Sequence, residues 1–224
     1  MKQIVMASQP RLKEKLELVK QNLSNAVFES MRLCLVQNNE FLCLEGERAT
    51  HLYILLDGRC RVFKTLENGK VLLVCHYEDI QVLGEFELFT DSIAKTTIQA
   101  MGELYCLVIS VPEHQELLLA DNRFLRWVCR RTCEKVERNN RTTAINLLYP
   151  LEQRLANYML VMQNDGVFFS NYTRLSQYLG CSHRHLLRTL GLLCEKQLLE
   201  KEGTRYRLKN PSALKQLAGN LFEP

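Results

Sequence analysis

Short apolar runs alternate with polar turn signals between Leu33 and Ile109. The runs are LCLV, FLCL, HLYILL, CRVFKTL, VLLVCHY, TTIQA and YCLVIS, and their length and composition are typical of β-strands. Glycine steps separate them, and the Asn68-Gly69 step is a strong marker of a β-hairpin. The pattern predicts a small β-roll or barrel. Such a roll encloses a cavity that can hold a small molecule or be filled by side chains.

Helical spacing of apolar residues flanks the predicted roll. Residues 11–31 carry leucines and valines at steps of three and four, which predicts an amphipathic helix followed by a short helical or turn segment. After the roll, residues 113–119 predict a short helix and residues 124–148 a long one. Pro150 is expected to separate the long helix from a further helix at 151–162.

One side of the long helix carries Leu125, Val128, Thr132 and Val136. Two copies of the chain can pair along this side as a short coiled coil, or the side can pack on the roll of the same chain. A helix of this length has room for both contacts, and we favour the dimer because of the motifs that accompany the helix.

The stretch 171–190, NYTRLSQYLGCSHRHLLRTL, has the spacing of two short helices joined by a tight turn. Asn171 is a suitable N-cap for the first helix, and Gly180 suits the left-handed backbone that ends it. Ser182 is a suitable N-cap for the second helix, which is expected to begin at His183. The stretch therefore predicts a helix-turn-helix.

The second helix of this pair has one apolar and one basic face. Leu186, Leu190 and Leu193 recur at helical spacing, while Arg184 and Arg188 share the opposite side. Residues 171–190 hold three arginines and no acid, so they can approach phosphates and guanine edges without repulsion. The pattern favours a helix in the major groove of DNA, although a helical hairpin inside a protein core has similar spacing.

Residues 199–208, LEKEGTRYRL, predict two strands joined by a turn at Gly203, which completes a winged helix-turn-helix. The distribution of charge also favours a nucleic-acid partner for this end of the chain. Residues 1–149 carry 19 basic and 19 acidic side chains, whereas residues 150–224 carry 10 basic and 6 acidic ones. The whole positive excess thus accompanies the helix-turn-helix.

The chain divides into three predicted parts. They are an N-terminal helix with a sensor roll at 1–111, a dimerisation helix and linker at 112–149, and a DNA-binding domain at 150–224. No apolar stretch is long enough to cross a membrane and no signal peptide is recognisable, so we expect a cytoplasmic protein. The nine cysteines are mostly scattered through apolar segments, which predicts buried thiols instead of a disulfide framework.

A β-roll, a long helix and a C-terminal winged helix-turn-helix make an α+β fold that resembles the CRP/FNR family of bacterial transcription regulators. The stretches that carry the resemblance are LEGERATHLYILLDGRCRVFK (44–64), ENGK (67–70), VLGEFELF (82–89), TCEKV (132–136) and LGCSHRHLLRTL (179–190). LENGK at 66–70 and HRHLL at 183–187 are also similar to the YeiL group of this family. The resemblance implies a cyclic-nucleotide-binding-like roll, a homodimer, a palindromic DNA operator, allosteric control by a small-molecule effector, and RNA polymerase as a partner.

The resemblance assigns the effector pocket to Gly84, Glu85, Lys95, Thr96, Thr132 and Cys133. In relatives that bind cyclic AMP, a Gly-Glu pair and a later Arg-Ser or Arg-Thr pair hold the phosphate. Here Gly84-Glu85 matches, but Lys95-Thr96 replaces the later pair, and lysine lacks the planar fork that grips a phosphate at two points. Glu87 adds a negative charge to the same turn. These departures argue against cyclic AMP, while Thr132-Cys133 match the place where the family's long helix contacts the nucleotide base.

Oxygen sensors of the FNR type carry closely spaced N-terminal cysteines that hold an iron-sulfur cluster. The first cysteine here is Cys34, so the resemblance does not extend to that cluster. Cys129 and Cys133 lie four residues apart on the long helix and can form a thiol pair, a metal site or an intersubunit bridge, or can pack in the structure. We favour packing, because two thiols alone are an incomplete metal site.

The resemblance assigns DNA contacts to Arg174, Ser182, His183, Arg184, Leu187, Arg188 and Arg205. Many relatives carry Glu at the position of Arg184, where it reads cytosine, and Arg at the position of Arg188, where it reads guanine. The arginine at 184 therefore predicts a different DNA half-site. His183 is expected to touch phosphate or to cap locally, and Leu187 to meet a thymine methyl group or to pack against the wing.

Two other functions fit a β-roll. Rolls of this type also house cupin-type, metal-dependent oxygenases, but His51 and His76 are the only histidines within the roll and neither belongs to a His-x-His pair. We therefore expect neither an enzyme nor a metal site. The other alternative is a regulator of the same fold that needs no small molecule, in which the roll serves as a scaffold.

Overall fold

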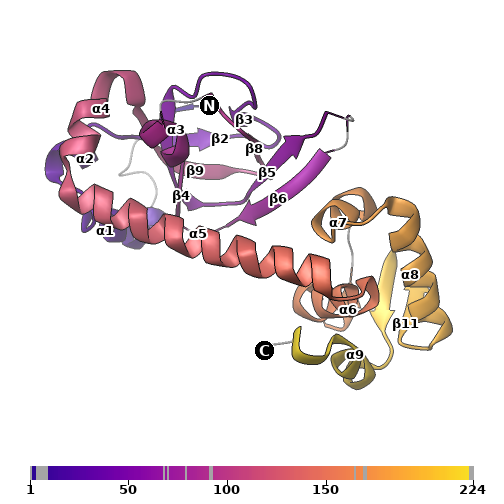
Figure 1. Ribbon diagram of the computed structural model, residues 1–224. Helices are drawn as coiled ribbons and strands as arrows, with labels where there is room; N and C mark the ends of the chain where they lie inside the picture. Colours follow the sequence, from indigo (N-terminus) through magenta and orange to yellow (C-terminus); the bar gives the residue numbers. More distant parts are fainter. Residues whose placement is uncertain are drawn as a thin grey trace. The chain divides into compact units, whose positions relative to one another are not determined.

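The computed structural model describes residues 2–3, 10–67, 69, 71–78, 80–90, 93–163, 165–168 and 171–221. The chain divides into two compact units, Met1–Glu137 and Arg138–Pro224. Figure 1 shows the helices and strands of both units, which are described one at a time below.

Two antiparallel sheets form a β-roll in the first unit. Among the described residues, the larger sheet has the strand order β1-β2-β9-β4-β7 and the smaller sheet the order β3-β8-β5-β6. The strands are β1 (Lys2–Gln3), β2 (Arg32–Val36), β3 (Phe41–Cys43), β4 (His51–Asp57), β5 (Cys60–Thr65), β6 (Val71–Tyr77), β7 (Gln81–Leu83), β8 (Thr97–Ala100) and β9 (Leu104–Ser110). The β-roll predicted between Leu33 and Ile109 is confirmed.

The hairpin of β5 and β6 surrounds the predicted Asn-Gly turn. Asn68 lies outside the described residues. Gly69 has a φ of 74°, and Thr65 pairs with Val71 across the turn in antiparallel register. A left-handed glycine at this point is what a tight hairpin requires.

Both faces of the larger sheet are buried. Along β4, Leu52, Ile54 and Leu56 pack in a core shared with helices, whereas Tyr53 and Leu55 point into the core between the two sheets. Successive side chains of a strand point to opposite faces, so two-sided burial requires a continuous apolar run. This explains why HLYILL does not alternate with polar residues.

Helices cover the outer face of the larger sheet (Figure 1). The helices of the first unit are α1 (Lys13–Lys20), α2 (Asn25–Glu29), α3 (Glu85–Thr90), α4 (Val111–Ala120) and the beginning of α5 (Asn122–Leu148). A 3-10 turn, Pro10–Leu12, precedes α1. The predicted amphipathic segment at 11–31 thus corresponds to α1 and α2.

Asp121 begins the long helix α5. Its Oδ1 accepts hydrogen bonds from the backbone N–H groups of Arg123 and Phe124 at 2.9 and 3.2 Å, and its Oδ2 accepts one from the N–H of Ser24 at 2.7 Å. Burial by itself would raise the pKa of Asp121, but these hydrogen bonds outweigh it and lower the pKa. One carboxylate therefore caps α5 and ties it to the start of α2.

The first part of α5 packs on its own chain. Val128 is fully buried in the core of the first unit, and Leu125 is partly buried against it. Val128 is therefore unavailable to a second copy, which corrects its assignment to a dimerisation face. Thr132 is half-buried and Val136 is 53% exposed, so both leave side-chain surface outside this core.

The second unit combines helices with a sheet of order β10-β12-β11. Its elements after the end of α5 are α6 (Leu151–Met162), β10 (Val167–Phe168), α7 (Tyr172–Tyr178), α8 (His183–Glu195), β11 (Leu199–Glu202), β12 (Arg205–Leu208) and α9 (Pro211–Ala218), with a 3-10 turn at Gly219–Leu221. Its apolar core includes Leu155, Met159, Leu186 and Leu193, all fully buried. The predicted winged helix-turn-helix and the helix break at Pro150 are confirmed.

The division into two units falls inside α5, after Glu137. The helix α5 continues without interruption across this boundary (Figure 1). The predicted division into three parts, with limits at 111 and 149, stays a prediction.

Candidate nucleic-acid interface and sensor site

A glycine turn joins α7 to α8. Gly180 has a φ of 59°, and the N–H groups of Gly180 and Cys181 donate to carbonyls in the last turn of α7 at 3.3 and 2.9 Å. These two bonds form a Schellman motif, which ends the helix. Ser182 then caps α8, because its Oγ accepts a hydrogen bond from the N–H of His185 at 3.2 Å. The two caps fix where the second helix begins.

The two faces of α8 differ sharply in exposure. Leu186, Leu190 and Leu193 are buried, whereas Arg184 and Arg188 on the opposite side are exposed. Neither arginine makes a hydrogen bond or ion pair with any residue that the structure describes. Their guanidinium groups retain all their donors for an external acceptor.

The other predicted contact residues of the helix-turn-helix come from α7 and α8. Leu187 is 41% exposed, so it is not packed in the core. The His183 ring lies 6.3 Å from the ring of Tyr172, edge-on, which ties the start of α8 to α7. Arg174 belongs to α7, but its side chain lies outside the described residues.

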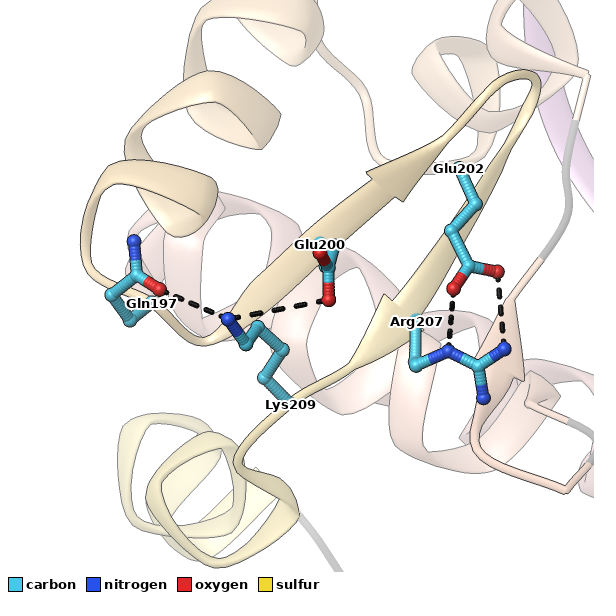
Figure 2. Close-up of polar contacts among 5 residues, drawn as sticks. All are labelled: Gln197, Glu200, Glu202, Arg207 and Lys209. Carbon is cyan, nitrogen blue, oxygen red and sulfur yellow. Dashed lines mark hydrogen bonds and ion pairs between the residues drawn. The ribbon is translucent and has the colours of Figure 1, made fainter.

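Two cations of the wing, the hairpin of β11 and β12, already have partners in the chain (Figure 2). Nε and Nη2 of Arg207 donate to the two carboxylate oxygens of Glu202 at 2.5 and 3.2 Å, and this lowers the pKa of Glu202. The Nζ of Lys209 donates to Oε1 of Gln197 at 3.2 Å and lies 4.0 Å from a carboxylate oxygen of Glu200. The sequence shows that the wing carries both basic and acidic residues, but only the structure shows which of its charges are paired.

Arg205 differs from these two cations. It lies opposite Glu202 in the hairpin register, yet the Glu202 carboxylate is bonded to Arg207. Within the described residues, Arg205 is exposed and makes no hydrogen bond or ion pair. Of the two wing arginines, Arg205 is thus the one whose donors are all available to a phosphate, because Arg207 already donates two hydrogen bonds to Glu202.

The predicted effector residues begin at the junction of β7 and α3. Gly84 has a φ of 89°, and a Cβ at this position would lie 2.8 Å from the backbone oxygen of His51. Glycine is therefore required here by the close approach of two backbone segments. No ligand is needed to explain it.

Glu85 is paired with Lys135, a residue that the sequence pattern did not indicate as part of the site. The Nζ of Lys135 lies 2.5 Å from Oε1 of Glu85, and the two side chains are only 10% and 12% exposed, respectively. The same ammonium group donates to the carbonyl of Val82 and lies 5.2 Å from the centre of the Tyr77 ring. Lys135 stands seven residues after Val128, on the same helix face as this buried valine, and that spacing was the available signal.

The remaining predicted effector residues do not join this pair. Lys95 and Cys133 are exposed, and Thr96 and Thr132 are half-buried. No hydrogen bond or ion pair links any of the four to Glu85 among the residues that the structure describes.

A pocket of about 170 Å³ opens beside Gly84. Its lining comes from β3, β4, the segment between them, Gly84 and Ile98. Of the predicted effector residues it includes Gly84 alone. Pockets that enclose drug-sized ligands measure roughly 300–1,000 Å³, so this pocket is small for a nucleotide.

The cysteines differ in exposure, and four of the nine, Cys43, Cys75, Cys181 and Cys194, are half-buried. Cys34, Cys60 and Cys106 are buried in the roll, as predicted, and burial raises the pKa of Cys60 to about 12. Cys129 and Cys133 are exposed on α5, so the interpretation that they pack in the structure is wrong for the single chain. No group of three or more metal-binding side chains with suitable geometry occurs among the described residues.

Known proteins match this chain along both units. Residues 34–121 match the family model of the cyclic nucleotide-binding domain, and residues 153–217 match that of the Crp-like helix-turn-helix domain. The chain is 34% identical over 179 residues to the regulatory protein YeiL of Escherichia coli O157:H7, covering 80% of this chain and 82% of that protein.

Solved structures support the fold. A CRP-family transcriptional regulator from Thermus thermophilus, TTHB099, superposes with a TM-score of 0.69 at 21% identity, over 83% of this chain and 96% of that one. A protein assigned to the CRP/FNR family from Eubacterium rectale superposes with a TM-score of 0.79 at 11% identity, over 91% and 99% of the two chains. In the part of the chain that the structure describes, no helix is both long enough and apolar enough to span a membrane.

Proposed function

This chain belongs to the CRP/FNR family of transcription regulators, and we propose that it acts as a homodimer that binds a palindromic DNA operator through α8. The relatives that match along most of the chain are regulators and not enzymes. Its site of action is then the compartment that holds DNA, the cytoplasm of a bacterium, where RNA polymerase is a candidate partner.

The observation that carries the proposal is the pair of exposed, unpartnered arginines on α8. Arg184 and Arg188 stand one helical turn apart on the face opposite the buried leucines. A guanidinium group can donate two parallel hydrogen bonds to O6 and N7 of guanine, or it can contact phosphate. With Arg205 on the wing available to the DNA backbone, the unit offers both kinds of contact. Since Arg184 replaces the glutamate that many relatives carry, we expect a half-site richer in guanine contacts than theirs.

Dimerisation is assigned to the exposed side of α5. Val136 is 53% exposed and Leu147 is 80% exposed. Cys129 precedes Val136 by seven residues, and Thr143 lies seven residues after Val136 and four before Leu147. A stripe of this spacing favours pairing with an identical helix. Two recognition helices related by a two-fold axis read half-sites about 34 Å apart, one turn of DNA.

The roll supports two versions of this function. In the first, a small-molecule effector binds the roll and shifts the placement of α5. In the second, the roll is a scaffold that needs no effector, and the observation that favours it is that the Glu85 carboxylate is already bonded to Lys135. Cyclic AMP is a poor candidate for the effector of the first version. Lys95 is exposed, and no arginine forms a described ion pair with Glu85 in its place.

The test is selection of DNA sites from a random pool by the purified chain, with and without cyclic nucleotides. We expect a two-fold symmetric site. Arg188→Ala should then bind this site about 10- to 100-fold more weakly, since one bidentate base contact contributes ~1–3 kcal/mol. Arg59→Ala, which removes an exposed arginine of the roll, is the matched control and should bind as the unaltered chain does. Equal affinity of Arg188→Ala and the unaltered chain would show that α8 is not the reading helix.

A further inference from the structure

Arg154, near the start of α6, contacts the ends of two other helices in the second unit. Its Nε donates to the carbonyl of Tyr149 at 3.0 Å, immediately after the last residue of α5. Its Nη1 donates to Oδ1 of Asn146 at 2.9 Å and also to the carbonyl of Leu179, immediately after the last residue of α7. One half-buried guanidinium group thus joins α5, α6 and α7.

The acceptors are groups that need a partner. The last carbonyls of a helix have no intrahelical donor, and they carry the negative end of the helix dipole. A guanidinium group presents several donors in a rigid plane, so it can satisfy carbonyls of two helices at once and hold the angle between them. A lysine in its place would supply the charge without the fixed geometry.

The contact continues into the turn that sets up the recognition helix. Leu179 directly precedes Gly180, and a Cβ added to Gly180 would lie 4.0 Å from Cγ and Nδ2 of Asn146. The last turn of α5 therefore lies against the Schellman turn between α7 and α8. A change in the angle at Arg154 would move α8 relative to the end of α5.

We propose that Arg154 is a positioning residue that fixes the angle at which α5 carries the α7–α8 pair, and that it thereby sets the half-site spacing this protein accepts. The inference rests on the proposed binding of a two-fold operator by a dimer. In such a dimer the separation of the two recognition helices depends on this angle in each copy. Arg154 itself need not touch DNA.

The experiment measures affinity for operators whose half-sites are moved apart or together by one or two base pairs. Each inserted base pair rotates one half-site by about 35° and shifts it by about 3.4 Å. The unaltered chain should prefer one spacing by at least about tenfold, because a mismatch must be met by deforming the DNA or the protein. Arg154→Met should bind the best spacing more weakly and discriminate between spacings by less than about threefold.

Controls separate positioning from general stability. Arg154→Lys retains the charge. Compared with Arg154→Met, it should restore affinity for the best spacing more fully than it restores discrimination between spacings. Asn146→Ala removes one acceptor and leaves the arginine, so it should lower discrimination less than Arg154→Met does and gives a second test if that variant folds poorly. Arg59→Met should discriminate as the unaltered chain does.

Folded Arg154→Met and Asn146→Ala variants that keep the full spacing preference would overturn the inference. Failure of the proposed function would look different, because the unaltered chain itself would then select no two-fold site.

Discussion

The two candidate sites use positive charge in opposite ways. On α8, Arg184 and Arg188 are close in the sequence, exposed, and without a partner among the described residues. Where α5 meets the roll, Lys135 is buried and bonded to Glu85, fifty residues earlier in the chain, and to Val82. An exposed cation is available to an anionic ligand, whereas a buried cation is compensated within the fold because burying an unpaired charge is prohibitive.

This difference teaches how each site can be recognised. The two arginines of the candidate DNA site on α8 lie on one continuous segment, so their relative placement follows from helical spacing alone. The candidate sensor site is assembled from separate segments, and the contacts of its residues come only from the neighbours that the fold supplies. The same contrast separates Arg205 from Arg207 on the wing, where Arg207 is bonded to Glu202 and Arg205 has no hydrogen bond or ion pair among the described residues.

The largest expected effect tests whether α8 has a buried face that stabilises the fold and an exposed face that is free to bind DNA. Leu186 is fully buried and Leu187 is 41% exposed, one residue further along α8. Leu186→Ala should lower the free energy of unfolding by about 4 kcal/mol, from lost burial and a cavity. Leu187→Ala should change it by less than about 1 kcal/mol but weaken DNA binding. Urea unfolding followed by circular dichroism, with a DNA titration, measures both, and similar stability losses for the two leucines would contradict the assigned faces.

The next effect tests whether the charge of the sensor site is compensated internally. Lys135→Met should lower the free energy of unfolding by about 3 kcal/mol, because it leaves the Glu85 carboxylate without its cation. Adding Glu85→Gln to that variant removes the unpaired charge, so it should lower the free energy of unfolding little further or should raise it again. The pair is measured as a double-mutant cycle in urea. Additive losses would indicate that the two side chains do not depend on each other.

The smallest of the three expected effects concerns Asp121, whose carboxylate joins the start of α5 to the start of α2. Asp121→Ala should lower the free energy of unfolding by about 2 kcal/mol at neutral pH, through loss of the α5 cap and of the bond to Ser24. The folded-state pKa of Asp121 is lowered, so its contribution is full above the unfolded pKa of about 3.9 and is lost as the pH falls through the folded value. The stability difference between the two chains should therefore shrink below about pH 4. A difference that stays constant down to about pH 2.5 would mean that the charge of Asp121 is not what matters.

Much of this molecule followed from its sequence. The apolar runs with glycine turns determined the β-roll, the caps at Gly180 and Ser182 determined where α7 ends and α8 begins, and the spacing of Leu186 and Leu190 determined which face holds the arginines. These features depend on interactions between residues a few positions apart, which a linear pattern contains.

Other features were decided only by the tertiary structure. The sequence pattern predicted that Val128 lies in a dimer interface and that Cys129 packs inside the structure. Instead, Val128 is buried in the core of its own chain and Cys129 is exposed. It gave no reason to pair Lys135 with Glu85 or Arg154 with the carbonyl of Leu179. Helical periodicity shows that a side chain lies on a face, but burial and pairing depend on what the rest of the chain brings to that face. Whether a charge is available for function is therefore a property of the folded chain, since it depends on segments far apart in the sequence.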